Sequence, residues 1–311
     1  MAGLVTGEQV RLEGFLAAAQ VTVLDVTRGA VTGTRRLLVG FPESFRVEYV
    51  VAVPDHAEAA VAVDGEVRIL TEVRARTTPP VQSTLPEVVA FTAIDDRPAV
   101  VFSAPGTPPP RLASQPPLPD YLAAMTVWLN ALWRSTQGLV GPVDLGRYAA
   151  DEMLARYAGS RRLAPVLGAV YDARRRVARL HSRRTAVHGC LCVAHTYVAD
   201  DAVVSVDDWS LGAVSGESLN DVGGLAVRIA GARLPEVLTG QTPFAQTIRD
   251  FVISGLAGAD LPPTRWCDVL ILAQAERAMG AVEYGVVDEI GLLARAVRAL
   301  PAAPDEPEAA S

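Results

Sequence analysis

The chain has 311 residues, which is enough for one large two-lobed domain or two small domains. Half of the residues are hydrophobic and a fifth are charged, a balance typical of a globular protein with a full-sized core. The net charge of −7 argues against a general nucleic-acid binder, which usually presents a basic face. We therefore expect no nucleic acid among its partners.

The sequence contains no lysine, so all 28 basic residues are arginines. A coding bias towards high GC content would explain this, because Arg and Lys are interchangeable on most solvated faces. The absence of lysine restricts the chemistry that the protein can perform. No mechanism that needs a Schiff-base lysine or a phosphate-anchoring lysine can operate here.

The cysteine content and the hydropathy of the sequence indicate the cellular compartment in which the protein works. Three cysteines are too few for a disulfide framework, which favours a reducing environment. The first residues lack the basic region of a signal peptide, and no uncharged apolar run reaches the ~18 residues of a membrane span. We expect a cytoplasmic protein that does not enter a membrane.

The first hundred residues are predicted to be mostly β. The Val-, Leu- and aromatic-rich runs bounded by turn residues are Gln20–Val26, Thr34–Gly40, Arg46–Pro54, Leu85–Phe91 and Pro98–Ser103, with a turn at Asp95–Asp96 before the last of them. One helix, Ala57–Arg76, interrupts the strands, because its apolar residues recur at helical spacing.

A proline-rich boundary follows. Ala104–Pro119 contains seven prolines, so it should be an extended linker rather than a packed element. We accordingly divide the chain into a β-rich N-lobe (1–104), a linker (105–119), a helical C-lobe (120–300) and a Pro- and acid-rich tail (301–311) that we expect to be disordered.

The rest of the chain is predicted to be helical, apart from one β insertion. Asp120 can cap a helix that runs to about Arg134. The other expected elements are helices at Asp144–Ala158 and Ala164–Leu180, a strand at Thr185–Val187, a hairpin of Thr196–Val198 with Ala202–Val206, and helices again from Leu219. This order predicts an α+β, bilobal, protein-kinase-like fold and not a doubly wound sheet.

The most informative stretch is His188–Asp221, HGCLCVAHTYVADDAVVSVDDWSLGAVSGESLND. It resembles the catalytic segment of the aminoglycoside phosphotransferase and choline kinase-like family. That segment has His-Gly-Asp-Leu, three residues, Asn, a two-stranded hairpin, Asp-Trp, and a later Asp that opens a helix. The matching residues are His188, Gly189, Leu191, Asp208, Trp209 and Asp221, and the resemblance covers about residues 20–230.

The resemblance implies a nucleotide site between two lobes. It makes Asp208 the metal-binding Asp, Glu66 the carboxylate of the N-lobe helix, and His188 the histidine of the catalytic loop. ATP and magnesium would then be the cofactors, held through Glu66, His195 and Asp208.

The departures from the family pattern weaken that expectation. Cys190 stands where the catalytic carboxylate would be, and a free thiol, with a pKa near ~8.5, is mostly neutral at pH 7. His195 replaces the Asn that binds magnesium, an ion that prefers oxygen ligands. The phosphate-anchoring lysine would fall near Ala52, and Arg46 or Arg68 could replace it only if the fold brought them there. We expect weak binding of ATP and magnesium at most.

The same loop allows other interpretations. His188, Cys190, Cys192 and His195 include the ligand types of a zinc site. A nucleophilic pair of Cys190 with a histidine is a second option. We expect Trp209 to lie in the core and Asp207 to meet solvent.

Two functions follow from the sequence. The first is a catalytically degenerate phosphotransferase-like protein that binds a ligand, a peptide or a partner protein, for example within a biosynthetic complex. The alternative is an atypical ATP-dependent phosphotransferase that acts on a hydroxyl of a small molecule, a sugar or a biosynthetic peptide. For a protein or peptide partner, the candidate surfaces are the Arg174–Arg176 cluster and the Trp128–Trp133 helix; the oligomeric state stays open.

Overall fold

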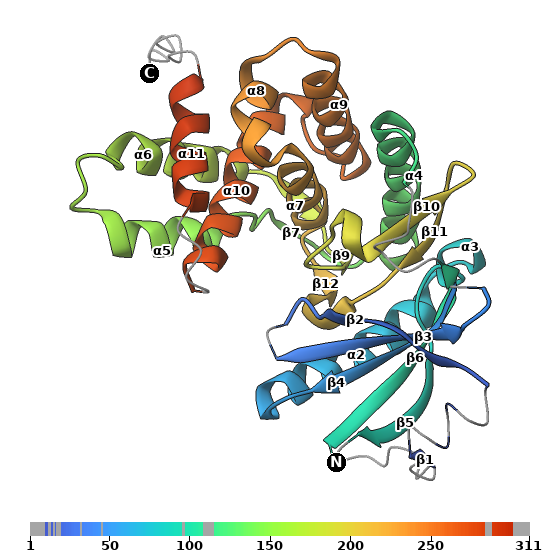
Figure 1. The fold of residues 1–311 in the computed structure, drawn as a ribbon. Coiled ribbons are helices and arrows are strands. Elements are labelled where there is room, and N and C mark those ends of the chain that lie inside the picture. The colour runs from blue at the N-terminus through green and yellow to red at the C-terminus, as the bar shows by residue number, and fades with distance from the viewer. Residues whose placement is uncertain are drawn as a thin grey trace. The chain divides into compact units, whose positions relative to one another are not determined.

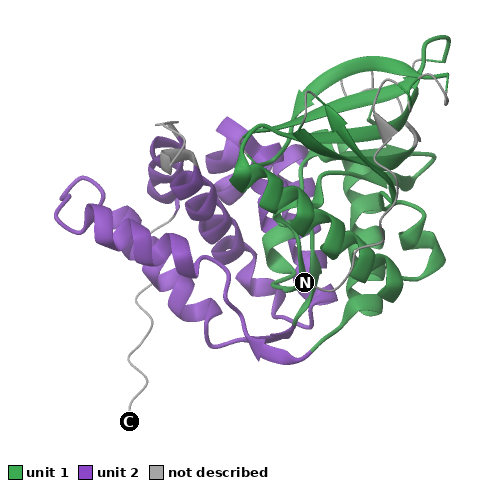
Figure 2. Cartoon of the chain, turned by 90° about the horizontal axis from the view of Figure 1, so that it is seen from below, with its two compact units in different colours: residues 1–138, 184–221 green, residues 139–183, 222–311 purple. Residues whose placement is uncertain are grey.

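The computed structural model describes residues 10–11, 14, 16, 20–31, 33–44, 46–94, 97–107, 115–283 and 288–300. The chain divides into two compact units, residues 1–138 with 184–221 and residues 139–183 with 222–311 (Figures 1 and 2). No helix within the described ranges is long and apolar enough to cross a membrane. The predicted turn at Asp95–Asp96 and the predicted disordered tail lie outside those ranges.

Unit 1 is built on a six-stranded sheet in the order β1-β5-β6-β4-β3-β2. All neighbouring strands are antiparallel except β1 and β5, which are parallel. The strands are β1 (Val10–Arg11), β2 (Thr22–Arg28), β3 (Thr34–Phe41), β4 (Arg46–Pro54), β5 (Val88–Ile94) and β6 (Arg97–Thr107). The predicted β4 has the observed bounds, whereas β5 begins three residues later than predicted because a short helix, α3 (Pro79–Gln82), and a turn occupy the residues before it.

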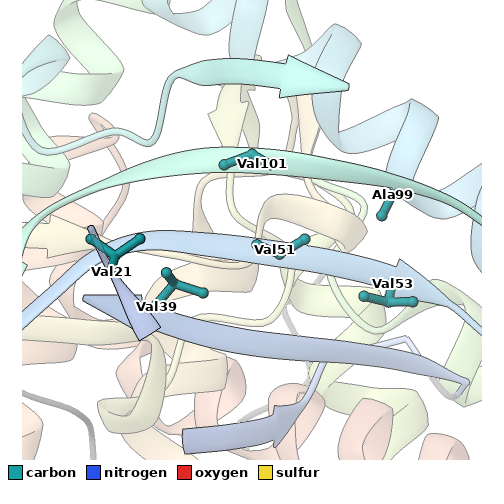
Figure 3. Packing of buried hydrophobic residues seen from close by; sticks show 6 residues of the cluster. All are labelled: Val21, Val39, Val51, Val53, Ala99 and Val101. Carbon is teal, nitrogen blue, oxygen red and sulfur yellow. The ribbon is translucent and has the colours of Figure 1, made fainter. Parts of the chain in front are cut away.

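The two faces of this sheet carry different residues, because successive side chains on a strand point to opposite sides. One face is a valine-rich cluster in which Val39, Val51 and Val101 are inaccessible to solvent (Figure 3). The other face carries Leu38 and Val50, which are Cα partners on β3 and β4. Arg36, two residues before Leu38, points to this second face.

Helix α2 (Ala57–Arg76) has the bounds predicted from the sequence. His56 caps it, since its Nδ1 accepts a hydrogen bond from the Ala59 N–H. Its buried stripe is Ala59, Val63, Glu66, Leu70 and Val73, so a carboxylate interrupts an otherwise apolar face. A fully buried acid in such a stripe needs a cationic or donor partner in the fold.

Helix α4 (Leu118–Thr136) follows the described residues 115–117. This helix begins two residues before the predicted cap, so Asp120 lies in its first turn and Pro117 precedes it. Gln115 is fixed against the β insertion, because its amide donates to the Thr196 carbonyl and accepts from the Val198 N–H. Residues 108–114 of the predicted linker are outside the described ranges.

The predicted β insertion is present in unit 1. Its elements are β9 (Thr185–Val187), η1 (Val193–His195), β10 (Thr196–Ala199), β11 (Ala202–Val206), η2 (Trp209–Leu211) and β12 (Ala213–Gly216). β10 and β11 form the predicted antiparallel hairpin, and β9 pairs with β12. The helix expected from Leu219 is α7 (Leu219–Ala230).

Unit 2 is mainly helical and is organised around α10 (Trp266–Glu283), which contacts α5, α6, α9 and α11. Its other elements are α5 (Arg147–Tyr157), α6 (Ala164–Val177), α8 (Leu234–Thr239), α9 (Pro243–Gly258), α11 (Asp288–Ala299) and the short helices η3 (Gly231–Arg233) and η4 (Pro263–Arg265). α6 ends three residues before the predicted Leu180, because the chain then enters β8 (His181–Arg183), which pairs with β7 (Val140–Pro142).

Candidate functional site

The loop that follows β9 is held by a buried carboxylate. Asp221 accepts hydrogen bonds from the backbone N–H groups of His188, at 2.8 Å, and Gly189, at 2.9 Å. Gly189 has a φ of +80°, and a Cβ there would lie 2.0 Å from the Leu211 carbonyl oxygen. Only glycine fits this position, which explains one of the residues that carried the family resemblance.

His188 is a structural part of this loop. Its side chain is fully buried, its Nε2 lies 2.6 Å from the Asp207 carbonyl oxygen, and its ring packs 5.1 Å from the Trp209 ring. Burial and the nearby His195 lower the pKa of His188. The imidazole is therefore neutral at pH 7, and its contact with the Asp207 carbonyl fixes Nε2 as the protonated nitrogen.

His188 and His195 stack with ring centroids 5.6 Å apart. The Nδ1 of His195 lies 3.1 Å from the Cys190 carbonyl oxygen, and its Nε2 lies 3.8 Å from Asp208 Oδ2. Burial lowers the pKa of His195, but a hydrogen bond with the Cys192 thiol and the charge of Asp208 outweigh it, so the pKa is raised overall. The raised pKa makes protonation of His195 easier, and a protonated imidazole has no lone pair for a metal ion.

Asp208 is almost completely buried, at 2% exposure, and both of its oxygens accept hydrogen bonds. Oδ1 accepts from Arg36 Nη2 at 2.8 Å and from the Ser210 hydroxyl at 2.6 Å, while Oδ2 accepts from the Ala30 N–H at 2.6 Å. Burial would raise the pKa of Asp208, but Arg36, His195 and these donors lower it to about 2. Asp208 is thus ionised and already paired within the chain.

Glu66 is the second carboxylate of the cluster. It accepts from Arg36 Nη2 at 2.5 Å and from the Trp209 N–H at 2.9 Å. Burial raises the pKa of Glu66 more than the charge of Arg36 lowers it. One guanidinium therefore joins Glu66 of α2 to Asp208 of the β insertion, two residues that are 142 positions apart in the sequence.

Arg36 is the functional candidate that the sequence reasoning missed. Arg46 and Arg68, which the sequence analysis named as possible replacements for a lysine at position 52, are both exposed. Arg36 and Ala52 are instead Cα partners on β3 and β4, so their side chains share one face. A signal was available: Arg36 lies at an inward position of an alternating strand, where a charged residue needs a partner.

Asp207 does not point simply into solvent, as the sequence had suggested. The residue is partly buried as a whole, but its Oδ1 is inaccessible and has no hydrogen-bond partner. Burial raises the pKa of Asp207 to about 6, against the opposing charges of Arg36 and His195. Trp209, in contrast, lies in the core as expected.

The cluster does not offer a metal site. Among the residues that the structure describes, no three His, Cys, Asp or Glu side chains are arranged to hold a metal ion, so the zinc interpretation is wrong for them. Magnesium is disfavoured beside Asp208, because the Arg36 guanidinium, 2.8 Å from Oδ1, already supplies the positive charge there, while Ser210 and Ala30 donate to the same carboxylate. His195 Nε2 and Asp208 Oδ2 lie 3.8 Å apart, and they form an ion pair when the imidazole is protonated.

The nucleophilic interpretation of Cys190 stays a prediction. The Cys190 backbone makes the contacts with the two imidazoles, its N–H at 3.3 Å from His188 Nδ1 and its carbonyl near His195. The Cys192 thiol also interacts with His195 and contributes to its raised pKa. Cys190 is partly exposed.

Comparisons with known proteins identify the fold. The sequence matches no protein-family model and no curated protein. A thermostable mutant of the aminoglycoside phosphotransferase APH(4)-Ia, in ternary complex with ADP and hygromycin B, superposes with a TM-score of 0.54 at 13% identity, over 92% of this chain and 97% of that chain. The apoenzyme of macrolide 2'-phosphotransferase MphH from Brachybacterium faecium has a TM-score of 0.53 at 15% identity, over 95% and 99% of the two chains.

The ternary complex of streptomycin, ATP and APH(2")-IIa is similar to the same degree, with a TM-score of 0.53 at 12% identity over 94% and 95% of the chains. The chain is thus structurally similar to aminoglycoside and macrolide phosphotransferases over nearly its full length. It has the bilobal kinase-like α+β fold of those proteins, an antiparallel N-terminal sheet followed by a helical C-lobe, which confirms the predicted fold class.

Proposed function

We propose that this chain is a catalytically degenerate phosphotransferase-fold protein that acts as a binding module for a small ligand, a peptide or a partner protein. One observation carries the proposal. Both oxygens of Asp208 are engaged by donors from within the chain, while position 190, where the resemblance expects a carboxylate, holds a thiol. These contacts support the proposal because Asp208 is already paired with a guanidinium and position 190 supplies no carboxylate to act as a general base.

The expected losses in the rate of phosphoryl transfer are large enough to abolish catalysis rather than to slow it modestly. Phosphoryl transfer depends almost entirely on positioning and charge neutralisation. A missing general base alone costs about 10²- to 10⁴-fold in rate. A missing metal ion removes a further stabilisation of several kcal/mol from the transition state. Both losses together leave little acceleration over solution chemistry.

Ligand binding is compatible with replacements of this kind in a structurally similar protein. Two of the structurally similar proteins are variants of APH(4)-Ia, one with an aspartate and one with an asparagine replaced by alanine, and each forms a ternary complex with a nucleotide and hygromycin B. Those two residues are five positions apart, as are Cys190 and His195. By analogy, replacement of both residues in this chain is compatible with ligand binding.

The partner surface predicted from the sequence contains both buried and exposed residues. Trp128 and Trp133 are buried, and the Trp128 indole N–H donates to the Thr84 hydroxyl. Arg174 donates to the Val143 carbonyl and pairs with Asp144, and Arg176 pairs with Asp268. Arg175, the middle residue of the cluster, has a side chain that is 61% exposed. The Arg174–Arg176 cluster and the outer face of the Trp128–Trp133 helix therefore stay a prediction for the partner surface.

The direct test is a turnover assay on the purified full chain. We expect no ADP above the rate of ATP hydrolysis in buffer when ATP, magnesium and a panel of aminoglycosides, macrolides and hydroxylated peptides are supplied. Saturation-transfer NMR on the same panel should still detect a bound compound. Sustained ADP release that depends on one acceptor would contradict the proposal, as would a panel that shows neither binding nor a stoichiometric partner on co-purification from the native extract.

The atypical phosphotransferase is the second candidate, and two observations favour it. The fold is that of small-molecule phosphotransferases over nearly the whole chain. Arg36 also restores the ion pair between a sheet cation and the α2 carboxylate that the absence of lysine had seemed to exclude. An acceptor-dependent phosphorylated product, identified by mass spectrometry, would establish this function in place of the first.

A further inference from the structure

The loop that Asp221 holds carries two cysteines close together. Cys190 and Cys192 are separated by Leu191, which is buried at 1% exposure, whereas both cysteines are partly exposed. Cα atoms two positions apart lie at most about 7 Å from each other. This distance is the upper end of the range that a disulfide bridges. Small reagents can therefore reach both thiols, and the spacing permits a bond between them.

The turn that follows places a histidine against Cys192. Cys192 precedes the single 3₁₀ turn η1, and the His195 N–H donates to the Cys192 carbonyl oxygen at 3.0 Å. Side chains three positions apart on such a turn lie one above the other. Accordingly, the His195 side chain is hydrogen-bonded with the Cys192 thiol. Its Nδ1 also lies 3.1 Å from the Cys190 carbonyl oxygen, so one imidazole contacts both cysteine residues.

The other nitrogen of that imidazole faces a carboxylate. His195 Nε2 lies 3.8 Å from Asp208 Oδ2, and the ring stacks on His188 with centroids 5.6 Å apart. An imidazole that takes up the proton of a thiol leaves a thiolate, which is the nucleophilic form of cysteine. A nearby carboxylate stabilises the imidazolium that this transfer creates. Cys192, His195 and Asp208 thus follow one another as thiol, imidazole and carboxylate, an order of groups that activates a nucleophile.

The third cysteine of the chain lies in a different environment. Cys267 belongs to α10, where burial and the charge of Asp268 raise its pKa to about 11. Such a thiol stays neutral at pH 7 and reacts slowly. Cys267 therefore serves as a reference for the reactivity of Cys192 within the same molecule.

We propose that this loop is an oxidation site, in which Cys192 reacts with a hydroperoxide and Cys190 then closes a reversible disulfide. Cys192 gives its proton to His195, its sulfur attacks the terminal peroxide oxygen, and the O–O bond breaks. The products are a sulfenic acid at Cys192 and an alcohol or water, which takes the proton from His195.

The second step joins the two cysteines. The Cys190 sulfur attacks the Cys192 sulfur, the S–O bond breaks, and the hydroxide leaves as water with the Cys190 proton. Two thiols are thereby oxidised by two electrons to a disulfide, and one hydroperoxide is reduced to an alcohol and water, or to two waters when the oxidant is hydrogen peroxide.

The test is peptide mass spectrometry of the full chain after treatment with hydrogen peroxide and alkylation of the remaining thiols. Cleavage after arginine leaves Cys190 and Cys192 together in residues 185–228 and Cys267 in residues 266–277. We expect the first peptide to lose two hydrogens and to escape alkylation, and dithiothreitol to reverse both changes. Without peroxide, iodoacetamide should alkylate Cys192 at least about tenfold faster than Cys267.

Two serine variants assign the steps. Cys190→Ser should keep Cys192 reactive and leave it as a sulfenic acid, which dimedone traps. Cys192→Ser should leave Cys190 reduced at the same dose of peroxide, because Cys192 makes the first attack.

A histidine variant tests the activation of Cys192. His195→Asn removes the proton acceptor and should slow alkylation of Cys192 at least about tenfold. The rate at Cys267 in the same sample reports whether the variant is folded, since unfolding would expose this buried thiol. His181→Asn is the matched control, because His181 is an exposed histidine on β8, and it should leave the rate at Cys192 unchanged. If His195→Asn unfolds, the two serine variants decide the question.

Equal alkylation rates of Cys192 and Cys267 would overturn the proposal. Oxidation of Cys190 in Cys192→Ser as fast as in the unmodified chain would do so as well, as would a disulfide between two chains in place of the internal one. An unchanged rate at Cys192 in folded His195→Asn would have the same consequence. The samples contain no nucleotide or other ligand, so none of these results depends on the proposed binding function.

Discussion

Arg36 on β3 and Ala52 on β4 are Cα partners, and the cation that reaches Glu66 comes from Arg36. The resemblance placed the cation one strand away, at position 52. Because directly opposed residues of an antiparallel pair share a face, either position can present a side chain to α2. The absence of lysine thus removes a residue type and leaves the positive charge of the cluster in place.

Removal of that charge should destabilise the fold. Arg36→Met leaves Glu66 and Asp208 buried without their cation, and breaking a buried ion pair in this way costs about 3–5 kcal/mol of the free energy of unfolding. Urea denaturation of the two proteins measures the difference. Arg35→Met breaks an exposed ion pair on the same strand and should cost less than about 1 kcal/mol. Equal effects of the two substitutions would show that the cluster contributes no special stability.

Introducing a carboxylate at position 190, where the family has its general base, should not restore phosphotransfer. In Cys190→Asp the loop regains a carboxylate, but Arg36, Ser210 and Ala30 still engage Asp208, and His195 is still a poor magnesium ligand. We expect no ADP above background with any hydroxylated acceptor, measured by a coupled assay. Cys190→Ser serves as the uncharged control. Acceptor-dependent ADP production by Cys190→Asp alone would show that the base was the single missing part.

The buried carboxyl group of Asp207 predicts a dependence of stability on pH. Its folded pKa of about 6 lies above the ordinary value of 3.8, so the folded state binds more protons than the unfolded state between these values. Stability from this group falls as the pH rises from about 4 to 6, and above pH 6 the fold bears the whole cost of the buried charge.

Asp207→Asn removes that cost. The variant should match the unmodified chain at pH 4 and exceed its free energy of unfolding at pH 8 by up to about 3 kcal/mol, given about 1.4 kcal/mol for each pKa unit. Chemical denaturation at the two pH values measures this difference. Asp201→Asn, in the exposed hairpin turn, should change stability equally at both. A pH-independent effect of Asp207→Asn would mean that the carboxyl group is hydrated.

Glycine is required at position 189. Gly189→Ala would place a Cβ 2.0 Å from the Leu211 carbonyl oxygen at a φ of +80°, so we expect a loss of at least about 3 kcal/mol in the free energy of unfolding. Gly168→Ala in α6, where a Cβ meets nothing within 4 Å, should instead stabilise the chain by about 0.5–1 kcal/mol. Thermal denaturation of the two variants provides the comparison. A tolerated alanine at 189 would show that the loop can rearrange away from Asp221.

The sequence by itself determined the order of elements and the fold class. Helical spacing fixed α2 at Ala57–Arg76, and the turn residues around Asp200 and Asp201 fixed the β10–β11 hairpin. These signals are local, because the period of apolar residues and the φ preferences of turn residues act over a few positions. The spacing from His188 to Asp221 likewise marked the loop that Asp221 holds.

Only the tertiary structure decided how the charges of the site are paired. Arg36, Glu66 and Asp208 come from β3, α2 and the β insertion, and no local pattern states that one guanidinium satisfies two carboxylates so far apart in the chain. The register of β3 on β4, which places Arg36 opposite Ala52, is equally non-local. Burial then set the charge states, since the desolvation of Asp207 and His188 depends on which segments cover them.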